Sequence, residues 1–332
     1  MGVSSSKPHP VETKWFPEFE ASLPSLEGKT VVITGTTSGT GAIVARTAAR
    51  KNAENLILLN RPSERAKKAE EALKKEETKT NIVSVDCDLQ DLESVTSAAA
   101  AIKKKYKAVD VLCNNAGVMA LEDKATKDGY DVQMQTNHIS HFLLTKELMP
   151  LLKKAKELRG EARVANHSSE ARHGKKLEAK YFEKNGGNLG GDGSSMFLRG
   201  ARWVRYQQSK LANAVFTKAL AEKFGDDSGL KATVAHPGLA ATNLQTTTAS
   251  TGGMGWGMWI MHFSQSQEDG AMPILAACFD KATVNGSFWA PSGMSQFSGP
   301  AKQIEWDKKS VDKDCIDVLW KTSEEAVGAF EI

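Results

Sequence analysis

The stretch that decides the fold is Thr30-Val31-Val32-Ile33-Thr34-Gly35-Thr36-Thr37-Ser38-Gly39-Thr40-Gly41. Its first five residues form a short apolar run that predicts a buried strand, and the alanine-rich stretch 42–51 that follows predicts a helix. Glycines between a strand and a helix let the backbone approach a pyrophosphate, whose negative charge the helix N-terminus attracts. A glycine-rich turn alone is more often only a turn, but its place between strand and helix favours a dinucleotide site.

Apolar runs and helical stretches continue to alternate along the chain. Such alternation predicts an α/β fold in which helices cover both faces of a parallel sheet. No internal repeat and no shift in composition suggests a second domain, so we expect a single one. We expect further strands at 56–59, 81–85, 109–113, 162–166, 231–235 and 287–290, and helices at 62–75, 92–106, 132–152 and 204–224.

The ends of the chain look different from its centre. We expect an N-terminal extension over 1–27, a main domain over 28–300, and a charged C-terminal extension over 301–332. A short amphipathic helix is predicted near 323–330. Pro62 suits the first turn of the helix at 62–75.

Composition limits the classes of protein that the chain can represent. The chain has 332 residues, of which 40% are hydrophobic and 25% charged, as in ordinary globular proteins. A net charge of +3 gives no electrostatic support for binding nucleic acid. The four cysteines are far apart, which argues against a disulfide framework or a zinc site and fits a reducing compartment. No apolar run reaches the roughly 20 residues of a membrane span, and no signal-peptide core is present, so we expect a cytoplasmic protein.

The first residues, Met1-Gly2-Val3-Ser4-Ser5-Ser6, match the pattern for myristoylation of Gly2. The alternative is a disordered polar start, and the sequence leaves both open. One acyl chain gives only marginal, reversible attachment. Peripheral membrane association through this lipid is therefore a second prediction for the location.

The end of the second predicted strand distinguishes between the two nicotinamide dinucleotides. An acidic residue there would bind the adenosine ribose, but this chain has Asn60-Arg61. A guanidinium can pair with the 2′-phosphate, which favours NADP(H), although Arg61 could also be a solvated residue at a strand end. Asp88, followed by Leu89, is placed to meet the adenine edge. Asn114-Asn115-Ala116-Gly117 ends the fourth strand, at the sheet edge where such folds bind ligands.

Tyr206 and Lys210 lie four residues apart in a predicted helix and so share one face. A nearby ammonium stabilises a phenolate, so we expect Lys210 to lower the pKa of Tyr206 and make it a better acid. The lysine could also hold ribose hydroxyls. Ser168 and Ser169 end a strand, where a hydroxyl could bind a carbonyl oxygen of the substrate. Taken alone, the spacing of the tyrosine and the lysine also arises by chance on amphipathic helices.

The histidines give weaker indications of a functional site than the tyrosine and the lysine. His138 and His141 have the spacing of a metal pair, but no third ligand or carboxylate is evident, so we expect packing or hydrogen-bonding roles and no metal site. His167 and His173 flank the serines, and of the two His167 is the candidate for substrate contact.

Together these motifs resemble the short-chain dehydrogenase/reductase family over about 28–242. The resemblance implies a Rossmann-type single domain with about seven parallel strands. It also implies a catalytic set in which Tyr206 is the general acid/base, Lys210 its electrostatic helper, Ser169 rather than Ser168 the group that orients the carbonyl, and Asn137 the holder of a relay water. The expected cofactor contacts are Gly35, Thr37, Ser38, Gly39, Thr40, Gly41, Arg61, Asp88, Leu89, Asn115, Ala116, Gly117, Tyr206, Lys210, Pro237, Gly238 and Thr242.

Within that family, the stretches 114–119, 136–142 and 209–213 look most like the retinol dehydrogenase branch, which includes relatives of protochlorophyllide reductase. The resemblance implies an NADP(H)-dependent oxidoreductase that reduces a carbonyl, or oxidises the alcohol, of a bulky apolar substrate. One alternative is reduction of a conjugated carbon–carbon double bond. Another is a non-catalytic NADPH-binding interaction protein.

The chain departs from the family pattern in three places. Thr40 replaces the usual isoleucine, for which we expect only a change in helix packing. The interval between Ser169 and Tyr206 is long and carries a glycine-rich loop over 185–195, expected to be mobile and to border the substrate. The apolar segment 254–263, within a predicted lid over about 243–268, offers Trp256 and Trp259 to an apolar substrate. Helix packing, a contact in a homodimer and a membrane surface are alternatives for that segment.

Overall fold

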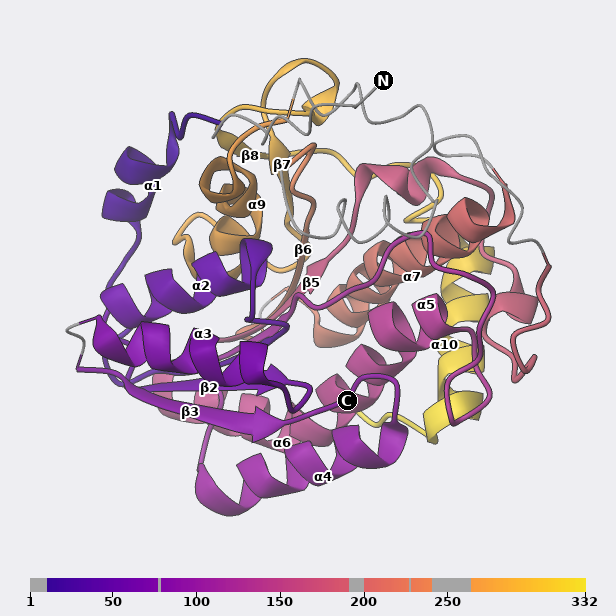
Figure 1. Cartoon of the computed structure of the whole chain (residues 1–332), viewed down its shortest axis with the longest axis horizontal. Helices are drawn as coiled ribbons and strands as arrows, with labels where there is room; N and C mark the ends of the chain where they lie inside the picture. Colours follow the sequence, from indigo (N-terminus) through magenta and orange to yellow (C-terminus); the bar gives the residue numbers. More distant parts are fainter. Residues whose placement is uncertain (1–10, 77–78, 191–199, 227, 241–263) are drawn as a thin grey trace, which may run out of the picture.

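The computed structural model describes residues 11–76, 79–190, 200–226, 228–240 and 264–332. Among these residues it contains one eight-stranded sheet in the order β3-β2-β1-β4-β5-β6-β7-β8, the centre of an α/β Rossmann-type fold (Figure 1). Seven strands are parallel, as predicted. The strands are β1 (Thr30–Thr34), β2 (Asn55–Asn60), β3 (Asn81–Asp86), β4 (Val111–Asn114), β5 (Ala162–His167), β6 (Leu230–Ala235), β7 (Phe288–Pro291) and β8 (Ala301–Gln303).

The strand β8 is an addition that the sequence pattern did not predict. It pairs antiparallel with β7, and Trp289 faces Gln303 in the register. Three residues, two of them polar and exposed, carry too little periodicity to be recognised as a strand. The first part of the predicted C-terminal extension therefore belongs to the sheet.

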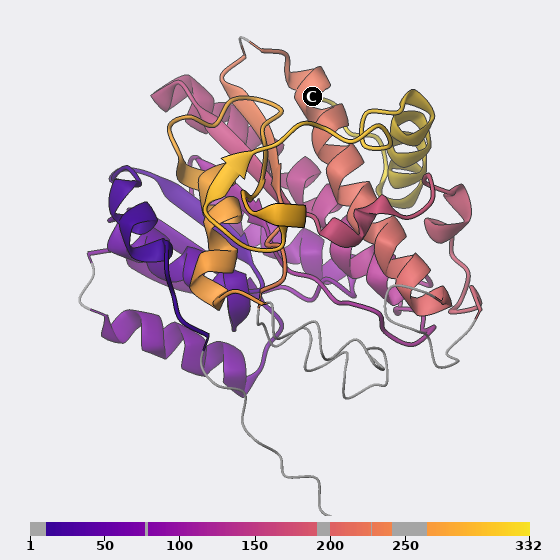
Figure 2. The ribbon, with the colours of Figure 1, turned by 90° about the horizontal axis from the view of Figure 1, so that it is seen from above.

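Helices cover both faces of the sheet (Figures 1 and 2). One apolar cluster joins α2, α9 and the N-terminal helix α1 to one face, and a second joins α4, α6, α7 and α10 to the other. Figure 2 shows α10 beside α7, far from α1 and α3. The helices are α1 (Phe16–Ser22), α2 (Gly39–Arg50), α3 (Glu64–Lys75), α4 (Leu92–Lys105), α5 (Val132–Met134), α6 (Ser140–Arg159), α7 (Ala201–Phe224), α9 (Gln267–Phe279) and α10 (Lys313–Val327).

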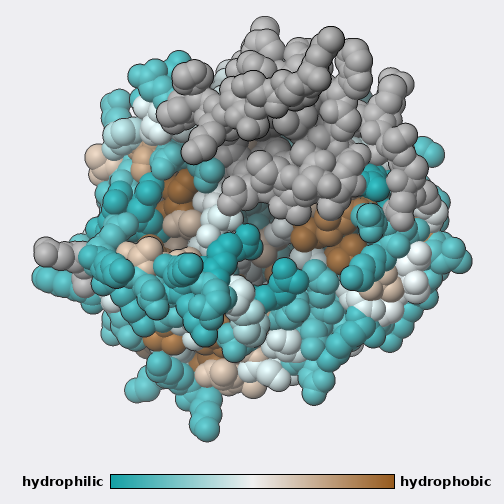
Figure 3. All heavy atoms as spheres, viewed as in Figure 1, coloured by the Kyte–Doolittle hydropathy of each residue, from teal (hydrophilic) through white to brown (hydrophobic). Residues whose placement is uncertain are grey.

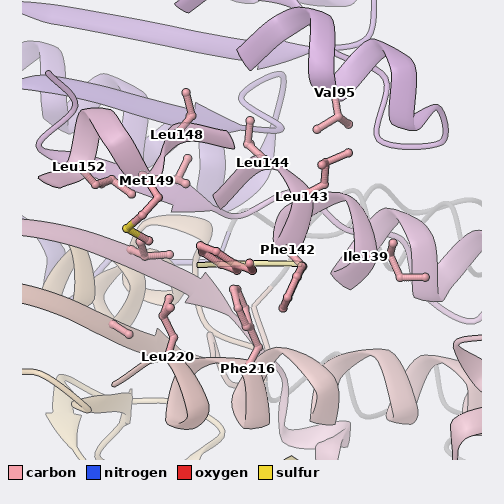
Figure 4. Packing of buried hydrophobic residues seen from close by; sticks show 14 of the residues in the cluster. Val95, Ile139, Phe142, Leu143, Leu144, Leu148, Met149, Leu152, Phe216 and Leu220 are labelled. Atoms are coloured by element: carbon pink, nitrogen blue, oxygen red, sulfur yellow. The ribbon is translucent and has the colours of Figure 1, made fainter. Parts of the chain in front are cut away.

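The centre of the second cluster is aromatic. The rings of Phe142 on α6 and Phe216 on α7 lie 5.1 Å apart, and Leu148, Met149 and Leu220 pack around them (Figure 4). All five side chains are buried. This packing fixes α7 against α6, and α7 is the helix that carries Tyr206 and Lys210.

The helix predicted over 132–152 is interrupted. The chain forms α5, then one π-helical turn at Gln135–Ile139, then α6. A π turn inserts an extra residue into a helix and is frequent at functional sites. Here it contains Asn137, whose side chain is held by Val118 and Ser209, so contacts distant in sequence decide the turn.

Two other helix boundaries differ from prediction. The C-terminal helix spans Lys313–Val327 instead of 323–330, because the Asp312 carboxylate accepts the N–H of Cys315 and caps its start. Its side chains Cys315 and Leu319 are buried. Pro62 precedes α3 instead of lying in its first turn, since the Ser63 hydroxyl accepts the N–H of Ala66 and is the cap.

The chain's N-terminal part forms a helix where none was predicted. The buried Asp269 carboxylate accepts the backbone N–H groups of Lys14, Trp15 and Phe16, which ties α1 to the start of α9. Among the described helices, none is long and apolar enough to cross a membrane.

Candidate active site

The chain reverses its direction of winding between β1 and β4, and a large cleft opens at the carboxyl ends of these strands. In doubly wound folds, ligands bind at this switch point. The cleft has a volume of about 1320 Å³, above the usual 300–1,000 Å³ of a single-ligand pocket, which leaves room for a cofactor and a substrate. Of the predicted site residues, the cleft is lined by Gly35, Thr37, Ser38, Gly39, Thr40, Arg61, Asp88, Leu89, Asn115, Ala116, Gly117, His167, Ser169, Tyr206, Lys210, Pro237 and Gly238.

Gly41 lies behind the glycine-rich turn instead of lining the cleft. A Cβ at this position would lie 2.2 Å from the Gly35 carbonyl oxygen and 2.3 Å from Nδ2 of Asn115. Only a residue without a side chain lets α2 approach β4 this closely. The role of Gly41 is therefore to shape the turn.

Asn115 links the turn to the rest of the sheet edge. Its Nδ2 donates to the carbonyl oxygens of Thr34 and Gly35, at 3.0 and 3.2 Å. Its Oδ1 accepts the hydroxyl of Thr40 at 2.9 Å and lies 3.0 Å from Nδ1 of His167. The expectation that Thr40 changes only helix packing is therefore wrong, since its hydroxyl holds this amide.

The end of β2 supports the same turn. The Asn60 side chain accepts the N–H of Thr36 and donates to its hydroxyl, both at 2.8 Å. Arg61 follows and lines the cleft, as do Ser63 and Arg65 at the start of α3. Arg65 was not among the predicted site residues, although it lies four residues after Arg61 and so one helical turn from it.

The Asn137 side chain is completely buried and sits between two elements of the site. Its Oδ1 accepts the N–H of Val118 at 2.7 Å, and its Nδ2 donates to the Val118 carbonyl at 2.9 Å and to Oγ of Ser209 at 2.8 Å. A Cβ on Gly117 would lie 3.1 Å from both Oδ1 of Asn137 and Nζ of Lys210. The segment after β4, the π turn and α7 are thus brought together at one point.

Lys210 is held by main-chain groups at the end of β5. Its Nζ donates to the carbonyl oxygen of His167 at 2.9 Å, an oxygen that also accepts from Nδ2 of Asn213. The Ser168 hydroxyl donates to the Lys210 carbonyl at 2.7 Å, so it is already engaged by the protein. Ser168 and Ser169 both line the cleft, and the Ser169 hydroxyl accepts the N–H of Ala171 and caps a short 3₁₀ turn. Burial lowers the pKa of Lys210 to about 8.

The expectation that Lys210 lowers the pKa of Tyr206 is wrong for the protein alone. Burial raises the pKa of Tyr206 to about 12, and a hydrogen bond with the Ser169 side chain opposes this rise. The Lys210 ammonium lies 6.0 Å from the centre of the tyrosine ring and is bonded elsewhere. Desolvation therefore outweighs the effect of the helical spacing.

The buried histidines have the packing and hydrogen-bonding roles that were predicted for two of them. His141 Nε2 lies 2.9 Å from the Thr34 hydroxyl, and His138 Nε2 lies 2.9 Å from that of Ser323. Burial lowers the pKa of His141 to about 4, and those of His138 and His167 to about 3. His167 lines the cleft in its neutral form, while the exposed His173 lies against Glu170.

The side of the cleft facing the tyrosine is apolar. Trp203, Met119 and Ala120 pack around Tyr206, with the Trp203 and Tyr206 rings 5.9 Å apart and edge to face. Trp203, Met119 and Leu121 line the cleft. On the face seen in Figure 3, apolar side chains gather over α5 and α7. Trp203, Met119 and Leu121 were not among the predicted site residues, although Trp203 is one helical turn from Tyr206.

The C-terminal part of the chain closes the cleft from another side. Ser295, Gln296 and Phe297 line it, and Gln296 Oε1 lies 2.8 Å from Nε2 of the buried His236. No local pattern predicted this contact, because more than 80 residues separate this segment from Tyr206.

Some predicted site residues lie outside the described residues. These are Gly2, Thr242, Trp256, Trp259 and most of the predicted lid. The glycine-rich loop is described only up to Gly190.

Comparisons with known proteins agree with this architecture. The model of the short chain dehydrogenase family matches residues 29–181. Human retinol dehydrogenase 13 is 31% identical over 316 residues, which cover 92% of this chain and 87% of that protein. A crystal structure of an uncharacterized protein from Mycobacterium paratuberculosis superposes with a TM-score of 0.72 at 30% identity, covering 94% of this chain and 98% of that chain. The Pseudomonas aeruginosa RhlG/NADP active-site complex shares the fold, with a TM-score of 0.58 at 20% identity over 80% of this chain and 94% of that chain.

The fold and the site define an oxidoreductase of the Rossmann type with a nicotinamide cofactor. The chain belongs to the short-chain dehydrogenase/reductase family, in the branch that contains the retinol dehydrogenases.

Proposed function

We propose that the protein is an NADP(H)-dependent reductase of a carbonyl group on a bulky apolar substrate, also able to oxidise the corresponding alcohol. The observation that carries the proposal is the convergence of Tyr206, Ser169 and Lys210 at one point of the cleft, beside an apolar wall. Two of these groups, Tyr206 and Lys210, are buried, so each interacts more strongly with a reacting oxygen than it would in water.

The preference for NADP(H) rests on Arg61. Its place at the end of β2 suits a guanidinium that pairs with the 2′-phosphate, and Arg65 lines the cleft one helical turn further on. Neither position carries an acidic side chain that would repel the phosphate.

A nicotinamide cofactor held along Gly35, Ser38 and Gly117 would supply the hydride that reduces the carbonyl carbon. Tyr206 donates its phenolic proton to the carbonyl oxygen, which becomes the hydroxyl of the product. A pKa near 12 keeps Tyr206 protonated at neutral pH, the form that donates, and so suits reduction. The Ser169 hydroxyl donates to the same oxygen and orients it. The proton relay through a water held at Asn137 is a further prediction.

The apolar substrate follows from the wall of Trp203, Met119 and Leu121. Retinol, the substrate named for human retinol dehydrogenase 13, is of this chemical class. Retinaldehyde and other large apolar aldehydes and ketones are therefore the first compounds to test.

The deciding experiment follows NADPH oxidation with a panel of apolar aldehydes, ketones and enones. We expect turnover with the wild-type protein and its loss in Tyr206→Phe, which keeps NADPH binding because only a hydroxyl is removed. Turnover retained in the variant would remove Tyr206 from the mechanism. A saturated ketone as the product of an enone would establish double-bond reduction instead, and tight NADPH binding with no oxidation would favour a non-catalytic role.

We also propose that the protein is cytoplasmic and that a myristoyl group on Gly2 attaches it reversibly to membranes. This proposal rests on the first six residues. In cells that myristoylate proteins, Gly2→Ala should move the protein from the membrane fraction to the supernatant. An unchanged distribution would contradict lipidation.

A further inference from the structure

Arg205, the residue before Tyr206, has a side chain that the proposed reaction does not use. It is a charged group with only 1% of its side chain exposed. Its Nη1 donates to the carbonyl oxygen of Gly190 at 2.7 Å, and its Nη2 donates to that of Leu121 at 3.1 Å. Its Nε lies 3.3 Å from Oδ2 of Asp131. Among the described residues, this guanidinium thus contacts three segments of the chain.

Asp131 connects this guanidinium to the element that carries Asn137. Its Oδ1 accepts the N–H groups of Gln133 and Met134, at 3.0 and 2.9 Å, so it caps α5 directly before the π turn. Its Oδ2 faces Arg205. The helix of Tyr206 and the helix leading to Asn137 are therefore joined through one buried ion pair, with 1% of each side chain exposed.

Of the other two contacts, the one to Leu121 reaches the cleft. Leu121 follows β4 and belongs to the apolar wall of the cleft. Gly190 ends the described part of the glycine-rich loop, and its N–H donates to Oδ2 of Asp123 at 2.6 Å. A Cβ on Gly187 would lie 2.8 Å from the backbone nitrogen of Ala125, which shows how closely this loop packs on that segment.

A buried ion pair is not the cheapest way to hold these segments together. Removing both charges from water costs several kcal/mol, and an apolar core of the same shape is often as stable. What the pair adds is geometry, because a guanidinium presents its donors in a fixed plane and can address several acceptors at once. The raised pKa of Asp131, about 6, is caused mainly by its burial, which Arg205 and the two capping N–H groups oppose.

We infer that Arg205 is a positioning residue that fixes Leu121 of the apolar wall and residues 185–190 relative to Tyr206. This inference rests on the proposed function for its kinetic consequence, but its structural consequence can be measured without turnover. None of the acceptors named above belongs to the glycine-rich turn or to β2. Loss of the guanidinium should therefore weaken substrate binding and turnover and leave NADPH binding intact.

The test compares Arg205→Met and Arg205→Lys with Arg163→Met. Arg163 is also buried. It pairs with Glu161 at 2.6 Å and donates to the carbonyl oxygen of Asp280 at 2.9 Å. It lies near the start of β5, whereas the cleft lies at the carboxyl end of that strand. It is thus a control for the loss of a buried, paired arginine outside this part of the site. The methionine retains most of the apolar stem, and the lysine retains the charge without the planar fork.

The first readout is amide hydrogen exchange in the protein with NADPH bound. We expect Arg205→Met to raise exchange within 118–131 and 185–190, Arg205→Lys to raise it less, and Arg163→Met to leave these segments unchanged. Unchanged exchange in both Arg205 variants, or the same increase in Arg163→Met, would overturn the inference. If Arg205→Met does not fold, Arg205→Lys supplies the comparison.

The second readout is kinetic and applies once a substrate is known. We expect Arg205→Met to raise KM for the substrate and lower kcat, each about tenfold, while the Kd for NADPH changes less than about twofold. A parallel loss of NADPH affinity would overturn the positioning role. Absence of any turnover in the wild-type protein would count against the proposed function and leave the exchange result to decide on Arg205.

Discussion

The two halves of the cleft are held together by different kinds of contact. In the cofactor half, which comprises the turn after β1, the start of α2 and the end of β4, the elements meet through neutral groups. One example is Gly41, which leaves space for the Gly35 carbonyl and the Asn115 amide. In the substrate half, a buried ion pair joins distant segments, as Arg205 does with Asp131. One half depends on close backbone approach and the other on paired charges.

This difference has a consequence for how substitutions act. Adding atoms should damage the cofactor half, because its contacts leave no space. Removing one charge should damage the substrate half, because the partner is left buried and unpaired. If the halves are independent in this way, cofactor affinity and substrate turnover can be changed separately.

The largest expected effect that would test this separation is on the substrate side. Ser169→Ala removes the donor to the carbonyl oxygen, and we expect kcat to fall about 10²- to 10³-fold. The Kd for NADPH, measured by fluorescence titration, should change little. Ser168→Ala is the matched control, because the Ser168 hydroxyl is already bonded to the Lys210 carbonyl. An equal loss in both variants would contradict the choice of Ser169.

On the cofactor side, Gly41→Ala places a methyl group against the Gly35 carbonyl and the Asn115 amide. Overpacking of this kind costs about 1–3 kcal/mol, and we expect NADPH to bind about 10- to 100-fold more weakly. Gly160→Ala, outside the residues that line the cleft, strains the backbone at φ +80° without any contact within 4 Å, so it controls for a loss of stability that leaves the turn unchanged. Unchanged NADPH affinity in Gly41→Ala would show that the turn tolerates displacement, and would weaken the comparison.

The choice of cofactor should depend on Arg61. Because a hydrogen bond to a charged group contributes about 1.5–3 kcal/mol, Arg61→Asp should shift the ratio of kcat/KM for NADPH over NADH about tenfold or more towards NADH. Arg65→Asp is the companion variant, and a smaller shift there would place the phosphate nearer Arg61. A ratio that neither variant changes would refute the assignment.

The smallest effect expected is on stability at acid pH. The pKa values of His138 and His141 lie near 3 and 4, below the value of about 6.5 in an unfolded chain. The unfolded chain therefore takes up protons first, so their contribution is fully present above pH 6.5 and is lost as the pH falls towards 4.

At pH 5 this loss is about 2 kcal/mol for each histidine. Urea unfolding at pH 7 and pH 5 should show a smaller difference in the unfolding free energy for His138→Gln and for His141→Gln than for the wild type. Only His141→Gln should also weaken NADPH binding, since His141 bonds the Thr34 hydroxyl at the cofactor turn. An undiminished pH dependence in both variants would show that other groups titrate.

Much of the cofactor half could be predicted because its residues lie in short sequence motifs. Thr34 to Gly41 and Asn114 to Gly117 act within a few residues of the strands that carry them, and Gly35, Thr37 to Thr40 and Asn115 to Gly117 line the cleft. The spacing of Tyr206 and Lys210 likewise placed both side chains on one face of α7. Their lining of the cleft, together with Ser169, needed no knowledge of distant contacts.

The substrate half could be predicted much less well. Trp203 had a local signal, because it lies one helical turn from Tyr206. Ser295 to Phe297 had none, because this segment lies between β7 and β8 and reaches the cleft through contacts with His236 and Leu239.

The sequence by itself determined the α/β class, the parallel sheet and the residues of the turn. These follow from local periodicity and from glycine, which act over a few residues. The tertiary structure alone decided the π turn at Asn137, the burial that raises the pKa of Tyr206 instead of lowering it, and the meeting of Arg205 with Asp131. Each of these features depends on desolvation or on contacts between segments far apart in the chain. Neither desolvation nor long-range contact can be read from the spacing of residues along the sequence.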